Sequence, residues 1–181
     1  MVYNPKIHHR RSIRLKGYDY SQAGAYFITI CCDDRICRFG KIVNKEMILN
    51  QFGLIAYKEW IKLADRFINF ELDVFQIMPN HVHMILVLKD VGASLGATLA
   101  VTQKENIINN FIDDEIVDDE NLWAGASPAP TAAPTASMSD IIGAYKSIVA
   151  NACLTIYKEK NEQMRKLWQR NCYEHIIRNE K

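Results

Sequence analysis

The sequence predicts an α+β domain in which an antiparallel sheet packs against two amphipathic helices. Residues 70–78 and 81–88 are rich in apolar and β-branched side chains and are separated only by a Pro-Asn pair, which is typical of an antiparallel hairpin. Apolar residues recur at helical spacing in residues 49–67 and again in residues 139–160. With 181 residues, 49% of them hydrophobic, the chain is long enough for one globular domain with a sizeable core.

The N-terminal part combines a basic arm with the first predicted strand. Residues 24–32 are aromatic and β-branched and form that strand, and residues 39–43 form a weaker one. Basic side chains can hold phosphates and aromatic rings can stack on bases. We therefore favour nucleic-acid contact over a solvated arm for the residues that precede the strand. These candidates are Arg10, Arg11, Arg14, Lys16 and Tyr18.

Polar residues mark the starts of the helices. Asn50 is predicted to cap helix 49–67, and Ser139 is predicted to cap helix 139–160. Both helices are expected to be scaffold for the core. In strand 70–78, simple alternation places four residues on one side of the sheet: Phe70, Leu72, Val74 and Gln76.

Residues 89–138 differ in composition from the rest and are predicted to be a flexible insertion. They hold 2 Lys/Arg and 8 Asp/Glu, whereas residues 1–88 hold 12 and 8 and residues 139–181 hold 8 and 5. Ala/Pro/Thr-rich sequence such as residues 127–137 buries too little surface to fold. The two flanking parts are therefore predicted to form one moderately basic domain, and such a charge fits nucleic-acid binding.

The predicted hairpin carries the candidate site. His81 and His83 are two residues apart on a strand, so both imidazoles point to one face while Val82 points to the other. Imidazole binds divalent metals, and two rings on a rigid strand need little reordering to do so. Two ligands would leave positions on the ion for water and substrate oxygens. The alternative is that one or both histidines are hydrogen-bonded core residues.

Other features limit the class of protein. The five cysteines contain no Cys-x-x-Cys pair and are predicted to be reduced structural thiols rather than zinc ligands or disulfides. No stretch approaches the roughly 20 apolar residues of a membrane helix, and the N-terminus lacks the apolar block of a signal peptide. The expectation is a cytoplasmic protein without a membrane partner.

Three motifs, taken in order, resemble a known family. Residues 79–86 read Pro-Asn-His-Val-His-Met-Ile-Leu, residues 143–147 read Gly-Ala-Tyr-Lys-Ser, and residues 167–179 read Leu-Trp-Gln-Arg-Asn-Cys-Tyr-Glu-His-Ile-Ile-Arg-Asn. Together they resemble the REP-associated tyrosine transposases, which are single-tyrosine transposases of the superfamily named for its histidine-hydrophobic-histidine (HUH) motif. The resemblance covers the chain except residues 89–138.

The resemblance implies a ferredoxin-like antiparallel sheet with helices packed on one face, of the HUH-endonuclease type. It implies that His81 and His83 bind Mg²⁺ or Mn²⁺, which polarises a scissile phosphate of single-stranded or hairpin DNA. In the family a tyrosine attacks that phosphate, which gives a 5′-phosphotyrosine intermediate and a free 3′-hydroxyl, and the DNA is later rejoined. Further candidates for DNA contact are Lys146, Trp168 and Arg170.

His175 is a candidate third metal ligand if the last strand lies beside the histidine hairpin, and a structural role is the alternative. An unrelated metallohydrolase that uses His81, His83 and His175 with an activated water is a further alternative. It would need carboxylate ligands, which the sequence does not obviously supply near the histidines.

The chain departs from the family pattern near its C-terminal end. In the family, the Arg-Asn-Glu region leads into a helix with Tyr-Ile-x-x-Asn-Pro, which bears the nucleophile, whereas this sequence ends at Lys181. Cys172 stands at a position that is usually aromatic. Three interpretations follow: a truncated product, which we favour; a protein that binds hairpin DNA and metal without cleaving; or an internal nucleophile, for which Tyr145 and Tyr173 are the candidates. A missing helix would expose an apolar groove, which favours a homodimer, and residues 176–181 resemble the start of a helix.

Overall fold

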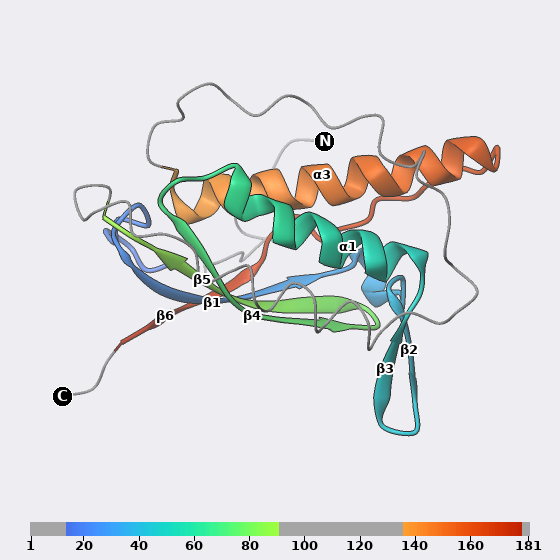
Figure 1. The fold of residues 1–181 in the computed structure, drawn as a ribbon, viewed down its shortest axis with the longest axis horizontal. Helices are drawn as coiled ribbons and strands as arrows, with labels where there is room; N and C mark the ends of the chain where they lie inside the picture. Colours follow the sequence, from blue (N-terminus) through green and yellow to red (C-terminus); the bar gives the residue numbers. More distant parts are fainter. Residues whose placement is uncertain (1–13, 91–135, 179–181) are drawn as a thin grey trace, which may run out of the picture.

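The computed structural model describes residues 14–90 and 136–178, so Arg10, Arg11 and most of the predicted insertion lie outside the described residues. Within them, four antiparallel strands form one sheet, and two helices lie on one of its faces (Figure 1). The α+β prediction is confirmed. The strands are β1 (Gly24–Cys31), β4 (Phe70–Met78), β5 (His81–Leu88) and β6 (Tyr173–Ile177), and the helices are α1 (Gln51–Lys62) and α3 (Met138–Glu159).

The order of strands in the sheet is β4-β5-β1-β6, so β5 and β1 are central. The turn Pro79-Asn80 joins β4 to β5, which confirms the predicted hairpin. β6 pairs with β1 and not with the hairpin. Because β6 runs through Ile177, the predicted helical start at Ile176 is wrong: the ladder to β1 keeps these residues extended.

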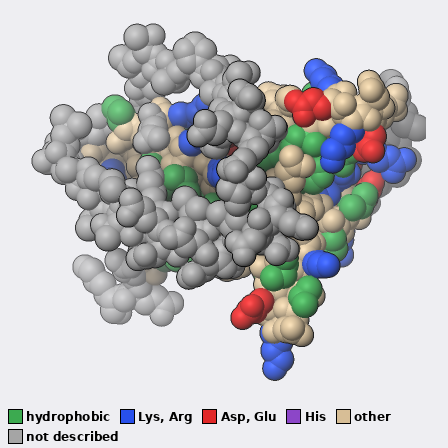
Figure 2. All heavy atoms as spheres, turned by 45° about the vertical axis from the view of Figure 1, so that its right-hand side comes forward, with side chains coloured by type: hydrophobic (Ala, Val, Ile, Leu, Met, Phe, Trp, Pro, Cys, Tyr) green, Lys and Arg blue, Asp and Glu red, His purple; other side chains and the backbone are tan. Residues whose placement is uncertain are grey.

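A second sheet of two strands projects from this body as an arm. β2 (Gly40–Val43) pairs with β3 (Glu46–Leu49), and Figure 2 shows apolar, basic and acidic side chains mixed along the projection. Asn44 and Lys45 form its two-residue turn with φ of 51° and 72°, the left-handed values of a type I′ turn. The sequence predicts β2 but not β3. Short 3₁₀ helices lie at η1 (Asp33–Arg35) and η2 (Leu63–Asp65).

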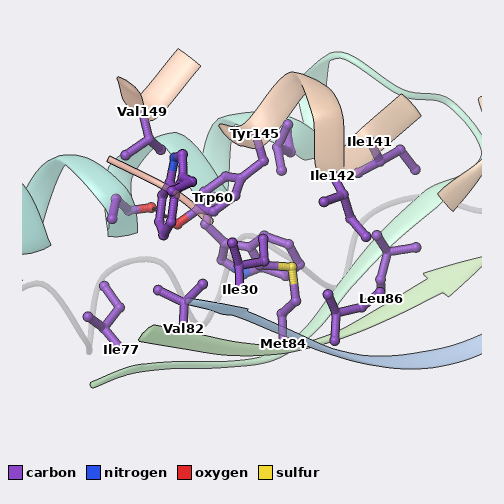
Figure 3. Packing of buried hydrophobic residues seen from close by; sticks show 14 of the residues in the cluster. Ile30, Trp60, Ile77, Val82, Met84, Leu86, Ile141, Ile142, Tyr145 and Val149 are labelled. Atoms are coloured by element: carbon purple, nitrogen blue, oxygen red, sulfur yellow. Dashed lines mark hydrogen bonds between the residues drawn. The ribbon is translucent and has the colours of Figure 1, made fainter. Parts of the chain in front are cut away.

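The core lies between the sheet and the helices (Figure 3). Trp60 of α1 stacks on Phe75 of β4 with ring centroids 4.9 Å apart, and the edge of Trp60 meets Tyr145 of α3. The Tyr145 hydroxyl donates to the carbonyl of Ala56 at 3.0 Å, which joins α3 to α1. Each buried large apolar side chain stabilises the fold by roughly 1.5–3 kcal/mol. The sheet contributes among others Ile28, Ile30, Val82, Met84 and Leu86.

Strand β4 does not alternate simply. Its register with β5 shifts between Leu72 and Phe75, which is a β-bulge that adds a residue to β4. Phe75 therefore pairs with a buried residue of β5, and Gln76 pairs with His83 on the opposite face. The prediction that Gln76 shares a side with Leu72 is wrong, because period-two counting cannot cross a bulge.

The helix caps follow the sequence with one correction. Asn50 caps α1 as predicted, its side-chain oxygen accepting from Gly53 N at 3.0 Å. Helix α3 is capped by Ser137 and not by Ser139. Ser137 and Asp140 form a capping box, in which each side chain accepts from the backbone N–H of the other. The residue three positions after Ser139 is apolar and offers no such partner.

Asn69 forms hydrogen bonds to residues on both sides of segment 91–135. It is 3% exposed, and its side-chain amide donates to the carbonyl of Ala136 at 2.9 Å while its side-chain oxygen accepts from Ala136 N at 3.3 Å. Its backbone carbonyl accepts from Lys89 N at 2.9 Å. One buried residue thus fixes both the end of the hairpin and the approach to α3.

All five thiols are free, as predicted. Among the described helices, none has the length and apolar character needed to cross a membrane.

Candidate functional site

The face of the sheet away from α1 and α3, here called the outer face, carries the candidate site. His81 and His83 of β5 lie on it, whereas Val82 between them is fully buried on the helix side, as the spacing predicts. In the register of β1 with β5, His81 is opposite Cys31 and His83 is opposite Thr29. The two histidines are therefore near the first residue of a central strand, and both are half-buried.

The imidazoles of this histidine pair face each other. Their Nε2 atoms are 3.0 Å apart, and the rings are nearly perpendicular with centroids separated by 4.6 Å. The Nδ1 atom of His81 lies 2.7 Å from Oδ1 of Asn80, and Nδ1 of His83 lies 2.8 Å from Oγ1 of Thr29. Each ring is thus hydrogen-bonded at Nδ1, and the two Nε2 atoms are in contact with each other.

Asn80 determines which nitrogen of His81 carries the proton. Its amide nitrogen donates to the carbonyl of Arg35 at 3.1 Å, which turns its Oδ1 toward His81. A carbonyl oxygen only accepts, so His81 Nδ1–H donates to it and His81 Nε2 bears a lone pair. Without a metal, His83 Nε2–H can donate to this lone pair while the Thr29 hydroxyl donates to His83 Nδ1. Because the Thr29 hydroxyl can also accept, His83 can carry its proton on Nδ1 instead of Nε2. The Nε2 atom of His83 then bears a lone pair, as Nε2 of His81 does.

The residues present fit a divalent cation. Two ligands at right angles on an ion with bonds of about 2.1 Å would be about 3.0 Å apart, and the Nε2 atoms of His81 and His83 have this separation. Metal-binding histidines usually donate their other N–H to a neighbouring acceptor, and Asn80 and Thr29 offer such acceptors. The two Nε2 atoms would hold the ion.

The surroundings favour the neutral form of His81. Burial lowers the pKa of His81, and the neighbouring His83 lowers this pKa further, so His81 is neutral at pH values at which an ordinary histidine is partly protonated. Phe27 of β1 stacks on His83 with ring centroids 5.4 Å apart and an interplanar angle of 24°. Phe27 therefore helps to fix the orientation of the second ring.

The structure does not bring His175 to the pair. β1 lies between β6 and β5, so His175 is two strands, or about 10 Å, from the histidine strand. It is exposed on the outer face opposite Phe27. The condition for its role as third ligand, a last strand beside the hairpin, is not met. In the described residues, no group of three or more His, Cys, Asp or Glu side chains is placed to hold a metal.

The two candidate tyrosines lie in different surroundings. Tyr145 is fully buried in the core on the helix side of the sheet, and burial raises its pKa well above the usual 10.0. Tyr173 is 62% exposed and lies on the outer face, opposite Thr29. Of the two, only Tyr173 shares a surface with the histidine pair.

Among the described residues of the basic N-terminal arm, Arg14 contacts β6. Arg14 forms an ion pair with Glu174 of β6, with Nε 3.1 Å from Oε1, and its guanidinium lies 5.6 Å from the ring centroid of Tyr20. Lys16 is exposed, and Tyr18 is half-buried with its ring edge-on to Tyr20 at 5.0 Å. Arg14 thus anchors the arm, and Lys16 presents its charge to solvent.

The DNA-contact candidates from the second and third motifs also divide into buried and exposed side chains. Lys146 Nζ donates to the carbonyls of Gln169 at 2.7 Å and Arg170 at 3.3 Å, and burial lowers its pKa. Trp168 is buried, and its indole N–H donates to the carbonyl of Lys146 at 3.0 Å. These two side chains tie α3 to the segment that leads into β6. The Arg170 side chain is exposed.

Sequence reasoning missed the three residues that hold the histidines: Phe27, Thr29 and Asn80. Phe27 and Thr29 occupy alternate positions of a strand that the sequence does predict, but only the register of β1 with β5 identifies their partners. Asn80 is part of the Pro-Asn-His-Val-His motif. Its place in the turn explains an asparagine there, so the sequence gives no sign that its side chain also contacts His81.

Comparison with known proteins finds a relative in Haemophilus influenzae, described as an uncharacterized protein, that is 36% identical over 180 residues, covering 99% of this chain and 84% of the relative. No family model matches the sequence. Among solved structures, the REP-associated tyrosine transposase bound to a REP hairpin aligns over 92% of this chain with 16% identity and a TM-score of 0.48, and the chain spans 64% of that protein's length. By the identity and coverage in sequence, this chain belongs to the same protein family as the Haemophilus influenzae protein.

Proposed function

We propose that this chain is a transposase-like protein whose histidine pair binds a divalent metal ion, Mg²⁺ or Mn²⁺, beside a DNA phosphate. The observation that carries the proposal is the 3.0 Å separation of the Nε2 atoms of His81 and His83, with both Nδ1 atoms hydrogen-bonded. The three sequence motifs that resemble the REP-associated tyrosine transposases supply the substrate class, which is single-stranded or hairpin DNA.

The topology supports a ferredoxin-like sheet of the HUH type. The main elements follow the order β1, α1, β4, β5, α3 and β6, and the sheet order β4-β5-β1-β6 puts the first and third of its four strands at the centre. This is the β-α-β-β-α-β pattern of ferredoxin-like domains. Both helices lie on one face, which leaves the other face to the histidines (Figure 1).

The chain's own side chains would position the metal and the phosphate. The ion, when bound, offsets the phosphate charge that resists attack by a nucleophile. His81 and His83 hold it through Nε2, and Asn80 and Thr29 keep the rings oriented. The exposed Lys16 and Arg170 are the described candidates for contact with the DNA backbone, with Arg10 and Arg11 as further predicted contacts.

Strand cleavage would also need a tyrosine hydroxyl. The phenol gives up its proton as its oxygen forms a bond to phosphorus, the bond from phosphorus to the 3′-oxygen breaks, and that oxygen takes up a proton to give a 3′-hydroxyl and a 5′-phosphotyrosine. Among the described tyrosines, Tyr173 is the one at a paired position of the outer face, about 10 Å from His83 across two strands. Tyr173 is therefore the internal candidate to test first.

Metal binding is tested directly by titrating the chain with Mn²⁺, using electron paramagnetic resonance to count the free ion. We expect His81→Ala and His83→Ala to weaken binding at least about tenfold. His175→Ala is the matched control, because His175 lies on the same face but two strands away. Equal Mn²⁺ affinity in wild type and His81→Ala would overturn the proposal.

Cleavage is tested by incubating the chain with labelled hairpin DNA and Mn²⁺ and looking for a protein–DNA adduct on a denaturing gel. An adduct that disappears in both His81→Ala and Tyr173→Phe would assign Tyr173 as nucleophile. An adduct that disappears in His81→Ala but persists in Tyr173→Phe would require another tyrosine.

Binding without cleavage is the second candidate function. It is favoured by the position of Tyr145 in the core and by the distance of Tyr173 from the histidine pair. It predicts metal-dependent retention of hairpin DNA with no adduct in any variant. A homodimer stays a prediction, which light scattering after size-exclusion chromatography would test.

A further inference from the structure

We infer that the outer face of the sheet is a platform on which the bases of single-stranded DNA stack, with Phe27 and Tyr173 as the stacking residues. The inference rests on the proposed function, because it takes a phosphate at the histidine pair as the reference point of the strand. Phe27 is 39% exposed and Tyr173 is 62% exposed. Neither ring is needed to fill the core, which lies on the other side of the sheet.

The two rings occupy neighbouring rows that run across the outer face. In one row His83 is opposite Thr29, which is opposite Tyr173; in the next row Phe27 has Ile85 on one side and a histidine of β6 on the other. Adjacent strands are about 4.8 Å apart. Phe27 is therefore one strand and Tyr173 two strands from the histidine pair, so consecutive bases of one strand can reach them while a phosphate lies at the pair.

Phe27 also links base stacking to the metal ligands. Its ring stacks on His83 at 5.4 Å, and its exposed surface remains available to a base. A base on Phe27 would restrict the ring that orients His83, so DNA binding and metal binding should each strengthen the other.

The charges on this surface suit a polyanion. On the outer face, Glu71 forms an ion pair with Lys89 at 2.6 Å, and Asp73, in the bulge of β4, is a second and exposed carboxylate. Glu174, the carboxylate of β6, pairs with a residue on the helix side of the sheet and is nearly inaccessible. Arg170 and Arg178, just outside the two ends of β6, are exposed.

Four-stranded sheets that bind single strands use aromatic residues for base stacking. Stacking tolerates any base, because every base has a flat face, and it needs bases that are not already stacked in a duplex. The platform therefore predicts preference for single strands over duplex, with little dependence on sequence at the stacked positions.

The test is fluorescence anisotropy with a labelled single-stranded oligonucleotide of mixed sequence and its duplex, in EDTA and again in Mn²⁺. Phe27→Ala and Tyr173→Ala are each expected to weaken single-strand binding about 5- to 100-fold in EDTA. Tyr173→Phe keeps the ring and should bind as wild type does. Ile42→Ala, which removes from the β2–β3 arm an apolar side chain whose exposure (53%) lies between those of Phe27 and Tyr173, is the matched control and should have no effect.

Two companion measurements separate the possible failures. Mn²⁺ titration of the same variants shows whether the metal site is intact. If both alanine variants bind Mn²⁺ and also bind DNA as tightly as wild type does, the platform is overturned and the proposed metal site stands. If Tyr173→Ala weakens DNA binding and the wild-type chain binds no Mn²⁺, the platform is supported and the metal site is overturned. Light scattering tests whether a second copy of the chain binds the outer face instead. If Tyr173→Ala dissociates a dimer and leaves the affinity for the oligonucleotide unchanged, the platform is overturned in favour of a dimer interface.

Discussion

At the scale of single residues, the position of one proton decides what the histidine pair can bind. The Thr29 hydroxyl lies 2.8 Å from His83 Nδ1 and can donate or accept. Thr29→Val keeps the shape of the side chain but removes the acceptor that His83 Nδ1–H needs when Nε2 holds a metal. We expect Mn²⁺ affinity to fall about 10- to 100-fold, measured by calorimetry. Thr155→Val on α3, whose hydroxyl bonds only within its helix, should bind as wild type does; equal loss in both variants would contradict the role of Thr29.

The cap of α3 is a second prediction for a single side chain. Ser137→Ala removes the hydroxyl that accepts from Asp140 N and donates to its carboxylate. We expect the free energy of unfolding to fall by about 1 kcal/mol in urea titrations. Ser147→Ala, at an exposed position inside the same helix, should change it by less than about 0.5 kcal/mol. A larger loss at Ser147 than at Ser137 would show that the cap is misplaced.

The same cap makes stability depend on pH. Hydrogen bonds from the Ser137 side chain and then from its backbone lower the pKa of Asp140 below the usual 3.8. The unfolded chain therefore takes up this proton first, so the stabilisation is fully present above about pH 4 and is lost as the pH falls through the folded-state pKa. The difference in stability between wild type and Asp140→Ala should shrink below about pH 4 in urea titrations at stepped pH. If the stability difference between wild type and Asp140→Ala grows as the pH falls, folding raises the pKa of Asp140 instead of lowering it.

At the scale of elements, two helical glycines should respond in opposite ways to alanine. A Cβ at Gly53 of α1 would clash with the carbonyl oxygen of Phe39, whereas a Cβ at Gly143 of α3 would meet nothing within 4 Å. Gly143→Ala should raise the free energy of unfolding by up to about 1 kcal/mol through helix propensity. Gly53→Ala should lower it, because the backbone of the β2 arm must shift. Thermal unfolding of both variants checks this, and stabilisation of both would mean that the contact at Gly53 is loose.

Elements that follow one periodic rule are predictable from the sequence, and elements set by distant contacts are not. Alternation and a Pro-Asn turn are enough to predict the histidine hairpin and to place His81 and His83 on the same face. The bulge in β4 and the pairing of β6 with β1 depend on neighbours remote in sequence, so alternation places Gln76 on the wrong side of the sheet and the sequence leaves open which strand lies beside His175. The contact of Thr29 with His83 joins residues 54 positions apart, and no local pattern encodes that register.

At the scale of the whole molecule, replacing residues 91–135 with a six-residue Gly/Ser linker tests the predicted insertion. Lys89 and Ala136 both bond to Asn69, so a short linker can join them. If the 45 residues act as a flexible chain, as their composition predicts, shortening the loop should stabilise the fold by up to about 2 kcal/mol. Urea unfolding measures this. A clear loss of stability would show that the segment packs on the domain.

The bonds at Asn69 also have a mechanical consequence. A load applied through residues 91–135, whether by a bound partner or by an attached cargo, first reaches the domain at the three hydrogen bonds of Asn69 with Lys89 and Ala136. These bonds would yield before the ladder of β5 or the turns of α3 are pulled apart. We therefore expect tension on residues 91–135 to break the hydrogen bonds of Asn69 before it displaces His81 and His83, which lie at the opposite end of β5.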